Sequence, residues 1–507
     1  MKQSNLRTDL YVNWIENERG VVILLRKKTK DKLLILYLLS HPNWTTDSLA
    51  LKLNQSKRYT KDLLKELKDD IVYHLDSPLN IQVGFSGEIT ITPHTPNDIL
   101  HLFYALKLAY LEHTNEFKLL HLLLQKQTPS IEAIANYLFV SPSYVRKIIN
   151  RMNAFFQPFQ FQISEEKKVY ELKGNELSIR LFFYVIMNDT YQSIPWPYKS
   201  KDFPDSIDYR QSLHIMLTIL NSRKSHKVRV PALSKKSAWI IAHMKETYNF
   251  IPHLKSQNIY FHNSLNQAAI EEYFIFFTHI CAPQVIPKEV KIVLGETFLN
   301  ATTDITFSRT LSYKIIDHFQ LDYEEEKKYL LAYYLTVLEG FYDLMQETTI
   351  LFEKLVFPPL EYSLLFEKKY IKEIVQVFQC FLSEECHEEL LNNYKLQQYF
   401  YGLIYTILQI ERPPVVRIFL YITNALTAQD LIRTRLETIY NSKTVLFVPY
   451  FEQADLVVTD SLNFGQDIDT EIFSFNTILK EDQWSLLLQK INQLILTKMT
   501  IQERDYE

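Results

Sequence analysis

The chain has little cysteine, little glycine and no long apolar run. Its 507 residues include 3 Cys and 8 Gly. Cys281, Cys380 and Cys386 show no paired spacing of the kind that binds a metal, so we expect no metal and a reducing compartment. So few glycines argue against a phosphate-cradling loop and a large nucleotide-binding sheet, and we expect no cofactor. Because no run of about 18 apolar residues and no apolar signal core occurs, we expect a cytoplasmic protein without membrane contact.

The length and charge of the chain predict a folded, multidomain protein with a basic amino-terminal third. Apolar residues make up 47% and charged residues 22%, which is typical of folded chains. A chain of 507 residues is too long for one hydrophobic core. Residues 1–175 hold 23 Lys and Arg against 18 Asp and Glu, a charge of +5, whereas the remainder carries −9. This asymmetry favours nucleic-acid binding by the amino-terminal part.

Two segments, residues 45–64 and 130–149, share the pattern of a helix-turn-helix. Hydroxyl residues stand where each helix begins, and a small residue stands where two crossing helices approach closely. Two such segments in register make DNA binding the leading hypothesis. The matched pairs are Thr45 with Ser130, Ala50 with Ala135, Ser56 with Ser141, Tyr59 with Tyr144, and Lys61 with Arg146.

A predicted hairpin follows each helix-turn-helix, so both units read as winged helices. Residues 81–85 and 88–92 alternate apolar and polar around Ser86-Gly87, and residues 159–163 and 169–172 do so around residues 165–168. Residues 21–25 fit either a short strand or the start of the next helix.

The turn inside each helix-turn-helix differs between the two units. This position is often glycine, but it is Asn54 in the first unit and Phe139 in the second. Asn tolerates a left-handed backbone, whereas Phe adopts one at a cost. Either the second turn is distorted or its geometry does not require a positive φ.

The rest of the chain predicts a mainly α-helical, multidomain protein that ends in a small α/β domain. Helical periodicity runs through residues 176–400, with breaks at residues 202–205 and 283–287 that favour two all-helical domains. Strand and helix patterns alternate after residue 415, which predicts a largely parallel sheet. The expected domains are residues 1–93, 94–175, 176–287, 288–405 and 406–507.

The two second helices of the helix-turn-helices supply the candidate DNA-binding residues. From Ser141 to Arg151 the sequence has three cations and no acid. We assign Arg146 and Arg58 to base edges, because a guanidinium offers a planar fork to guanine, and the lysines to phosphates. The full set is Ser56, Lys57, Arg58, Tyr59, Lys61, Lys65, Ser141, Ser143, Tyr144, Arg146, Lys147, Asn150 and Arg151, with Lys167 and Lys168 at the second wing tip.

Paired winged helices, two helical domains with scattered histidines and a small terminal α/β domain resemble the Mga/AtxA family of bacterial virulence regulators. Ser130–Ile149 is the sharpest motif for this resemblance. The resemblance implies binding to promoter DNA, transcriptional activation and self-association as a homodimer through the carboxy-terminal half. It also implies two PTS-regulation domains and an EIIB-like domain, where PTS is the sugar phosphotransferase system.

The same resemblance implies control by histidine phosphorylation from a PTS phosphocarrier. The candidates are His214, then His318 and His387. A working EIIB domain carries a phosphate-accepting cysteine after its first strand, but the corresponding turn, residues 421–425, has none. We therefore interpret the last domain as an interaction module without transferase chemistry.

Two other functions fit parts of this sequence pattern. A phosphotransfer carrier or enzyme would use the helix-turn-helices for protein docking, but it needs a reactive Cys or His in residues 401–507, and none occurs there. An RNA-binding antiterminator would need a small β-domain at its amino terminus. We expect a regulator without a catalytic site.

Overall fold

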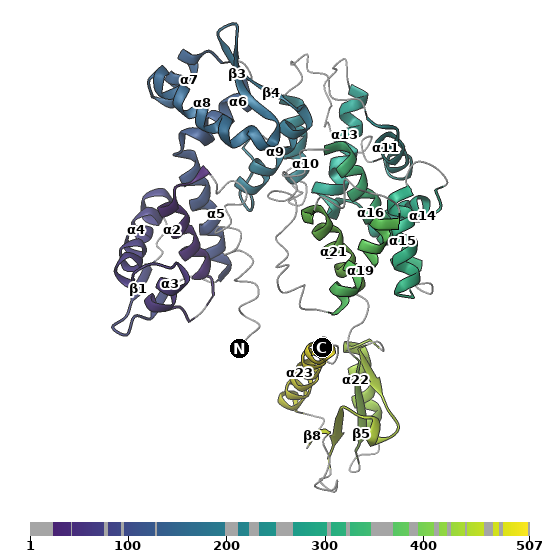
Figure 1. The fold of residues 1–507 in the computed structure, drawn as a ribbon. Helices are drawn as coiled ribbons and strands as arrows, with labels where there is room; N and C mark the ends of the chain where they lie inside the picture. Colours follow the sequence, from purple (N-terminus) through teal and green to yellow (C-terminus); the bar gives the residue numbers. More distant parts are fainter. Residues whose placement is uncertain are drawn as a thin grey trace. The chain divides into compact units, whose positions relative to one another are not determined.

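The computed structural model divides into two compact units, residues 1–361 and 362–507, which we describe separately. Most of the described chain is helical, as predicted (Figure 1). None of the described helices combines the length and the apolar character that a membrane crossing needs. The structure describes residues 24–41, 43–75, 80–92, 96–126, 129–197, 211–222, 233–249, 267–301, 306–320, 325–345, 369–384, 394–409, 415–422, 427–441, 444–460, 470–475 and 480–504.

The first module, which we define as residues 24–92, is a helix-turn-helix followed by an antiparallel hairpin (Figure 1). Its supporting helix buries a continuous apolar run from Leu33 to Leu38. The Lys32 ammonium of that helix lies 2.6 Å from the Asp70 carboxylate of the second helix of the motif. The elements are α2 (Lys27–Leu38), α3 (Thr46–Lys52), α4 (Lys57–Leu75), β1 (Asn80–Val83) and β2 (Ile89–Thr92).

The second module, residues 115–174, repeats this architecture. Its helices α6, α7 and α8 correspond to α2, α3 and α4, and its hairpin is longer than that of the first module. Phe156 and Phe161 join helix and wing, with ring centroids 4.6 Å apart. The elements are α6 (Asn115–Lys126), α7 (Ile131–Leu138), α8 (Pro142–Phe156), η2 (Gln157–Phe159), β3 (Phe161–Glu166) and β4 (Val169–Gly174).

Two helices flank the second module in sequence, α5 (Pro96–Glu112) and α9 (Glu176–Thr190). Lys107 of α5 is fully buried, and its ammonium lies 3.0 Å from the Asp189 carboxylate of α9. Burial lowers the pKa of Lys107, and the Asp189 charge opposes that change. A buried ion pair of this kind holds the two helices in one register.

Among the described residues of the first unit, six further α-helices and one short 3-10 helix follow α9. Helices on both sides of the predicted boundary at residues 287/288 contact one another, because His279 Nδ1 lies 2.7 Å from the Tyr333 hydroxyl and Lys236 Nζ lies 2.7 Å from Glu339 Oε1. The five-domain division stays a prediction. The elements are α10 (Gln211–Ser222), α11 (Lys235–Thr247), α13 (Gln267–Cys281), η4 (Pro283–Val285), α14 (Lys288–Leu299), α15 (Thr306–His318) and α16 (Glu325–Met345).

The second unit contains a four-stranded, fully parallel sheet of order β6-β5-β7-β8, which confirms the predicted small parallel sheet. The turn at residues 423–426 and His387 lie outside the described residues. The elements are α19 (Lys369–Glu384), α21 (Tyr394–Gln409), β5 (Val416–Tyr421), α22 (Ala428–Ile439), β6 (Val445–Phe447), η7 (Phe451–Gln453), β7 (Leu456–Thr459), β8 (Glu471–Ser474) and α23 (Glu481–Arg504).

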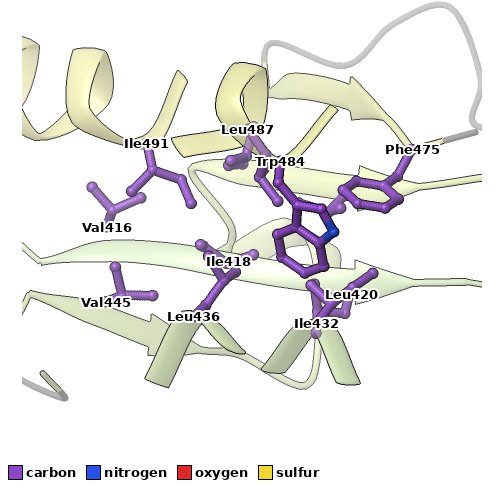
Figure 2. Close-up of a cluster of buried hydrophobic side chains, with 12 residues drawn as sticks. Val416, Ile418, Leu420, Ile432, Leu436, Val445, Phe475, Trp484, Leu487 and Ile491 are labelled. Carbon is purple, nitrogen blue, oxygen red and sulfur yellow. The ribbon is translucent and has the colours of Figure 1, made fainter. Parts of the chain in front are cut away.

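One face of this sheet carries the apolar core of the α/β part (Figure 2). Every second residue of β5 enters the core, and both α22 and α23 contribute to the same cluster. Tyr421 of β5, Leu446 of β6 and Ile472 of β8 point to the other face, where their side chains are exposed, whereas Val457 of β7 is buried on that face. The core cluster consists of Val416, Ile418, Leu420, Ile432, Leu436, Val445, Leu456, Val458, Phe475, Trp484, Leu487 and Ile491.

Candidate nucleic-acid interface

Side-chain caps begin the helices of both helix-turn-helices. Thr45 accepts a hydrogen bond from the Ser48 amide at 3.1 Å, and Ser130 accepts one from the Ala133 amide at 3.2 Å. Ser141 caps α8 in the same way at 3.3 Å, and the Ser56 hydroxyl accepts from the Tyr59 amide at 3.2 Å. The predicted start of each helix is therefore confirmed, and Ser56 and Ser141 act first as caps.

Both turns adopt the left-handed backbone, which corrects the expectation for the second module. Asn54 has φ 52° and Phe139 has φ 56°. The Gln55 amide donates to the Ala50 carbonyl at 2.9 Å, and the Val140 amide donates to the Ala135 carbonyl at 3.0 Å. The second turn is neither distorted nor free of positive φ, because the same helix-ending hydrogen bond closes both turns.

The exposed face of α8 collects the candidates predicted from the sequence. Val145 and Ile148 are fully buried, whereas the polar residues around them are exposed. No acid occurs along Pro142–Phe156, so nothing within the helix neutralises this face. The exposed candidates are Ser141, Ser143, Tyr144, Arg146, Lys147, Asn150 and Arg151. Their contact with DNA stays a prediction.

Arg146 and the second wing tip lie on the same side of the second module. The pKa of Glu132, on α7, is lowered first by hydrogen bonds from its own amide and from Ser130, and then by the charges of Arg146 and Lys168. Both cations therefore lie near one carboxylate. This arrangement places a cation of α8 and a cation of the wing on one side of the second module, around the Glu132 carboxylate.

The tip of the second wing is a two-residue turn made of lysines. Lys167 has φ 52° and Lys168 has φ 68°, between the paired residues Glu166 and Val169. Both lysines are exposed, and neither forms an ion pair within the described part of the chain. Asn and Gly normally occupy such a turn, so lysine at these two positions costs stability.

Arg151 differs from its neighbours on α8, because it forms an ion pair with Glu116 of α6. A candidate of the first module is also ion-paired, because the Lys57 ammonium lies 2.7 Å from the Asp47 carboxylate. Tyr59 is half-buried and hydrogen-bonded to Asp31, and burial is the main cause of its raised pKa. These three candidates are already engaged within their own modules, and Arg146 also makes a side-chain hydrogen bond with Tyr170.

The first module offers a weaker cationic face. Arg58, Lys61 and Lys65 are exposed on α4. Two of the four acids of this helix contact α2: the Glu66 carboxylate lies 2.6 Å from Lys28 and 3.0 Å from Lys32, and the Asp70 carboxylate lies 2.6 Å from Lys32. Lysines of the supporting helix thus neutralise Glu66 and Asp70, whereas Asp62 and Asp69 are exposed and weaken the cationic face.

Sequence reasoning missed how each wing is attached to its module. Thr45 pairs with Glu88 and Ser130 pairs with Val169, each as an isolated antiparallel bridge. The duplication therefore includes the attachment of the wing beside the first helix of the motif. The only sequence signal is the residue before each of these helices, which is both its cap and the bridge partner.

Among the described residues, no cluster of His, Cys, Asp and Glu could hold a metal ion.

Residues 103–186 match the model of the Mga helix-turn-helix domain. The chain is 26% identical over 216 residues to a putative trans-acting regulator of Streptococcus pneumoniae, covering 38% of this chain and 41% of that protein. It is 23% identical over 185 residues to the capsule synthesis positive regulator AcpA of Bacillus anthracis, covering 33% and 37%. The chain thus spans about two fifths of the length of these curated relatives.

The fold and the interface define a multidomain helix-turn-helix protein. The predicted resemblance is confirmed at residues 103–186, which match the Mga helix-turn-helix domain, and the chain is similar to proteins named as a trans-acting regulator and a capsule synthesis positive regulator. Both relatives are named as regulators rather than enzymes, in agreement with the expectation of no catalytic site.

Proposed function

We propose that this protein is a transcription regulator that binds double-stranded promoter DNA and activates transcription. The observation that carries the proposal is the second module, where Arg146 and Lys147 stand on an acid-free helix face beside Lys168 of the wing. A helix of this kind fits the major groove, and wing lysines reach the flanking phosphates.

The two modules divide the contacts by chemistry. Arg146 and Arg58 read base edges, and Asn150, Tyr144 and Ser143 add hydrogen-bonding groups on the exposed face. The exposed lysines Lys61, Lys65, Lys147, Lys167 and Lys168 neutralise phosphates and release counterions.

The test is binding of the full chain to promoter duplexes as a function of salt. Affinity should fall steeply as salt rises, because each neutralised phosphate contributes about 0.9 to the slope of the double-logarithmic plot. Arg146→Ala with Lys147→Ala should weaken binding about 100-fold and leave the helical content unchanged, since both side chains are exposed. The matched control is Lys235→Ala with Lys372→Ala, which removes the same charge from exposed positions on α11 and α19. Equal affinity of the two double variants would contradict the assignment.

We propose further that a PTS phosphocarrier regulates this activity by phosphorylating a histidine. His318 is exposed at the end of α15, where a carrier could reach it, and His214 is half-buried in α10. His387, outside the described residues, is the third candidate. A phosphoryl group adds about two negative charges and would shift a domain interface.

Incubation with a PTS phosphocarrier and labelled phosphodonor tests this regulation. Slow, stable labelling that His318→Ala or His214→Ala removes would support it. Rapid onward transfer to a sugar would instead support the alternative function, a phosphotransfer carrier or enzyme that docks proteins through its helix-turn-helices.

The carboxy-terminal half is proposed to form a homodimer through an EIIB-like domain. Tyr421, Leu446 and Ile472 are exposed on the face of the parallel sheet opposite the core that α22 and α23 cover. Parallel sheets are normally covered on both faces, so this apolar face suits a second copy. Leu446→Asp with Ile472→Asp should give monomers in sedimentation analysis, whereas Leu486→Asp, at an exposed position on α23, should not.

A further inference from the structure

The tip of the first wing carries one aromatic side chain, Phe85, that is fully exposed to solvent. Phe85 has 113% relative exposure, so its side chain is as open as in a free peptide. Exposing a phenyl ring to water is unfavourable, and a polar residue would serve this turn as well. The ring is therefore available for a partner outside the module.

The backbone of the turn fixes where this ring points. The Gly87 amide donates to the Gly84 carbonyl at 3.0 Å, so Phe85 and Ser86 are the two central residues of a tight turn. Gly87 follows with φ +87°, and a Cβ there would lie 2.7 Å from Thr46 Oγ1. Gly87 is required by both its backbone and its close contact with α3, which makes the tip rigid.

The wing is also fixed relative to the recognition helix α4. The Thr46 amide donates to the Gly87 carbonyl at 2.8 Å, and the Ile89 amide donates to the Trp44 carbonyl at 3.1 Å. From the other side, Lys68 of α4 donates to Asn80 Oδ1 of β1 at 3.0 Å. When α4 lies in a groove, Phe85 is held at a defined place beside it.

The tip of the first wing has no side chain suited to binding a DNA phosphate. No cation occurs from Gly84 to Glu88, in contrast to the Lys167-Lys168 tip of the second wing. The Glu88 carboxylate accepts a hydrogen bond from Ser86, which turns it back onto the wing. On a duplex an apolar ring can contact thymine methyl groups in the major groove or the stacked bases, and the stacked bases are the partner for a ring that enters the minor groove.

We propose that Phe85 is a wedge that enters the minor groove, separates one base step and bends the duplex. This inference rests on the proposed DNA-binding function and adds to it the mode in which the first module engages its site. The exposed lysines Lys61 and Lys65 of α4 hold the adjacent backbone while the ring inserts between two neighbouring base pairs.

The probe is a duplex of about 30 base pairs rich in TA steps, which unstack most easily, with 2-aminopurine scanned along it. Wild-type protein should raise the fluorescence at one step, because unstacking removes quenching. Phe85→Ser should abolish that rise and weaken binding about tenfold, the scale of one base–aromatic contact. Phe85→Leu, which keeps an apolar wedge, should retain part of the signal.

Phe139→Ser is the matched control, because Phe139 is 90% exposed in the second module but lies on a helix turn rather than a wing. It should keep both affinity and the fluorescence rise. If Phe85→Ser binds like the wild type with the same rise, the wedge is wrong and the regulator proposal survives. If the wild type binds no duplex at all, both proposals fail.

Discussion

The two modules share one backbone design and present different surfaces. Both have capped helices, a left-handed turn at Asn54 or Phe139, and a wing bridged to the residue before the first helix of the motif. Their wing tips differ, with Phe85 in one and Lys167-Lys168 in the other. The two modules therefore share the caps, the left-handed turn and the bridge that their common fold needs, and they differ in the exposed residues at the wing tips.

The charge around the recognition helices differs in the same way. In the first module, Asp47 engages Lys57, and α4 itself contains acids. In the second module, α8 has no acid and Arg146 and Lys147 form no ion pair within the described residues. Because phosphate attraction dominates affinity, we expect the second module to carry most of the binding.

The largest expected effect separates the two recognition helices. Arg146→Ala with Lys147→Ala should weaken binding to a promoter duplex about 100-fold, the combined scale of one base contact and one phosphate contact. Arg58→Ala with Lys61→Ala removes the same charge from α4 and should cost about tenfold, because nearby acids already weaken that face. Fluorescence anisotropy at one fixed salt concentration measures both. Equal losses would mean that the modules share the binding evenly.

Acid should weaken α6 of the second module more than α2 of the first, although burial also lowers the pKa of His74 on α4. His121 of α6 is buried, and burial lowers its pKa to about 4, whereas α2 has no histidine. Its folded pKa lies below the unfolded value, so its stabilisation is present above about pH 6.5 and is lost as pH falls toward 4. At pH 4.5 the second module should lose about 2 kcal/mol.

Hydrogen exchange of the α6 and α2 amides in the full chain, compared between pH 7 and about pH 4.5, measures this difference. His121→Leu should make the two helices respond alike. A variant that keeps the selective acid response would show that another group is responsible.

The sequence predicted the elements of both modules because caps, apolar spacing and turn residues are local signals. It also predicted the strands at Val416–Tyr421 and Leu456–Thr459, since short apolar runs bounded by polar residues favour a parallel sheet. It did not predict the pairing of Arg151 with Glu116 or of Tyr59 with Asp31. Those contacts join residues on different helices, and periodicity within one helix carries no information about its neighbour.

Lys167 and Lys168 of the second wing should increase the salt dependence of DNA affinity without stabilising the hairpin. Lys167→Asn with Lys168→Gly places the preferred residues in a turn where both backbones are left-handed. The slope of affinity against salt should fall by about 2, one for each lost phosphate contact. The hairpin should become more stable by about 1 kcal/mol, measured by exchange of its amides. An unchanged slope would remove both lysines from the interface.

The smallest effect tests whether the left-handed turn of the second module serves folding alone. Phe139→Asn copies the first module and should stabilise the turn by about 1 kcal/mol, because Asn tolerates the left-handed region and Phe does not. The reciprocal Asn54→Phe should cost a similar amount. Exchange of the Val140 and Gln55 amides, which close the two turns, reports each change directly. If Phe139→Asn also loses affinity for DNA, the exposed ring has a partner on the duplex, and the strain at this turn is retained for binding.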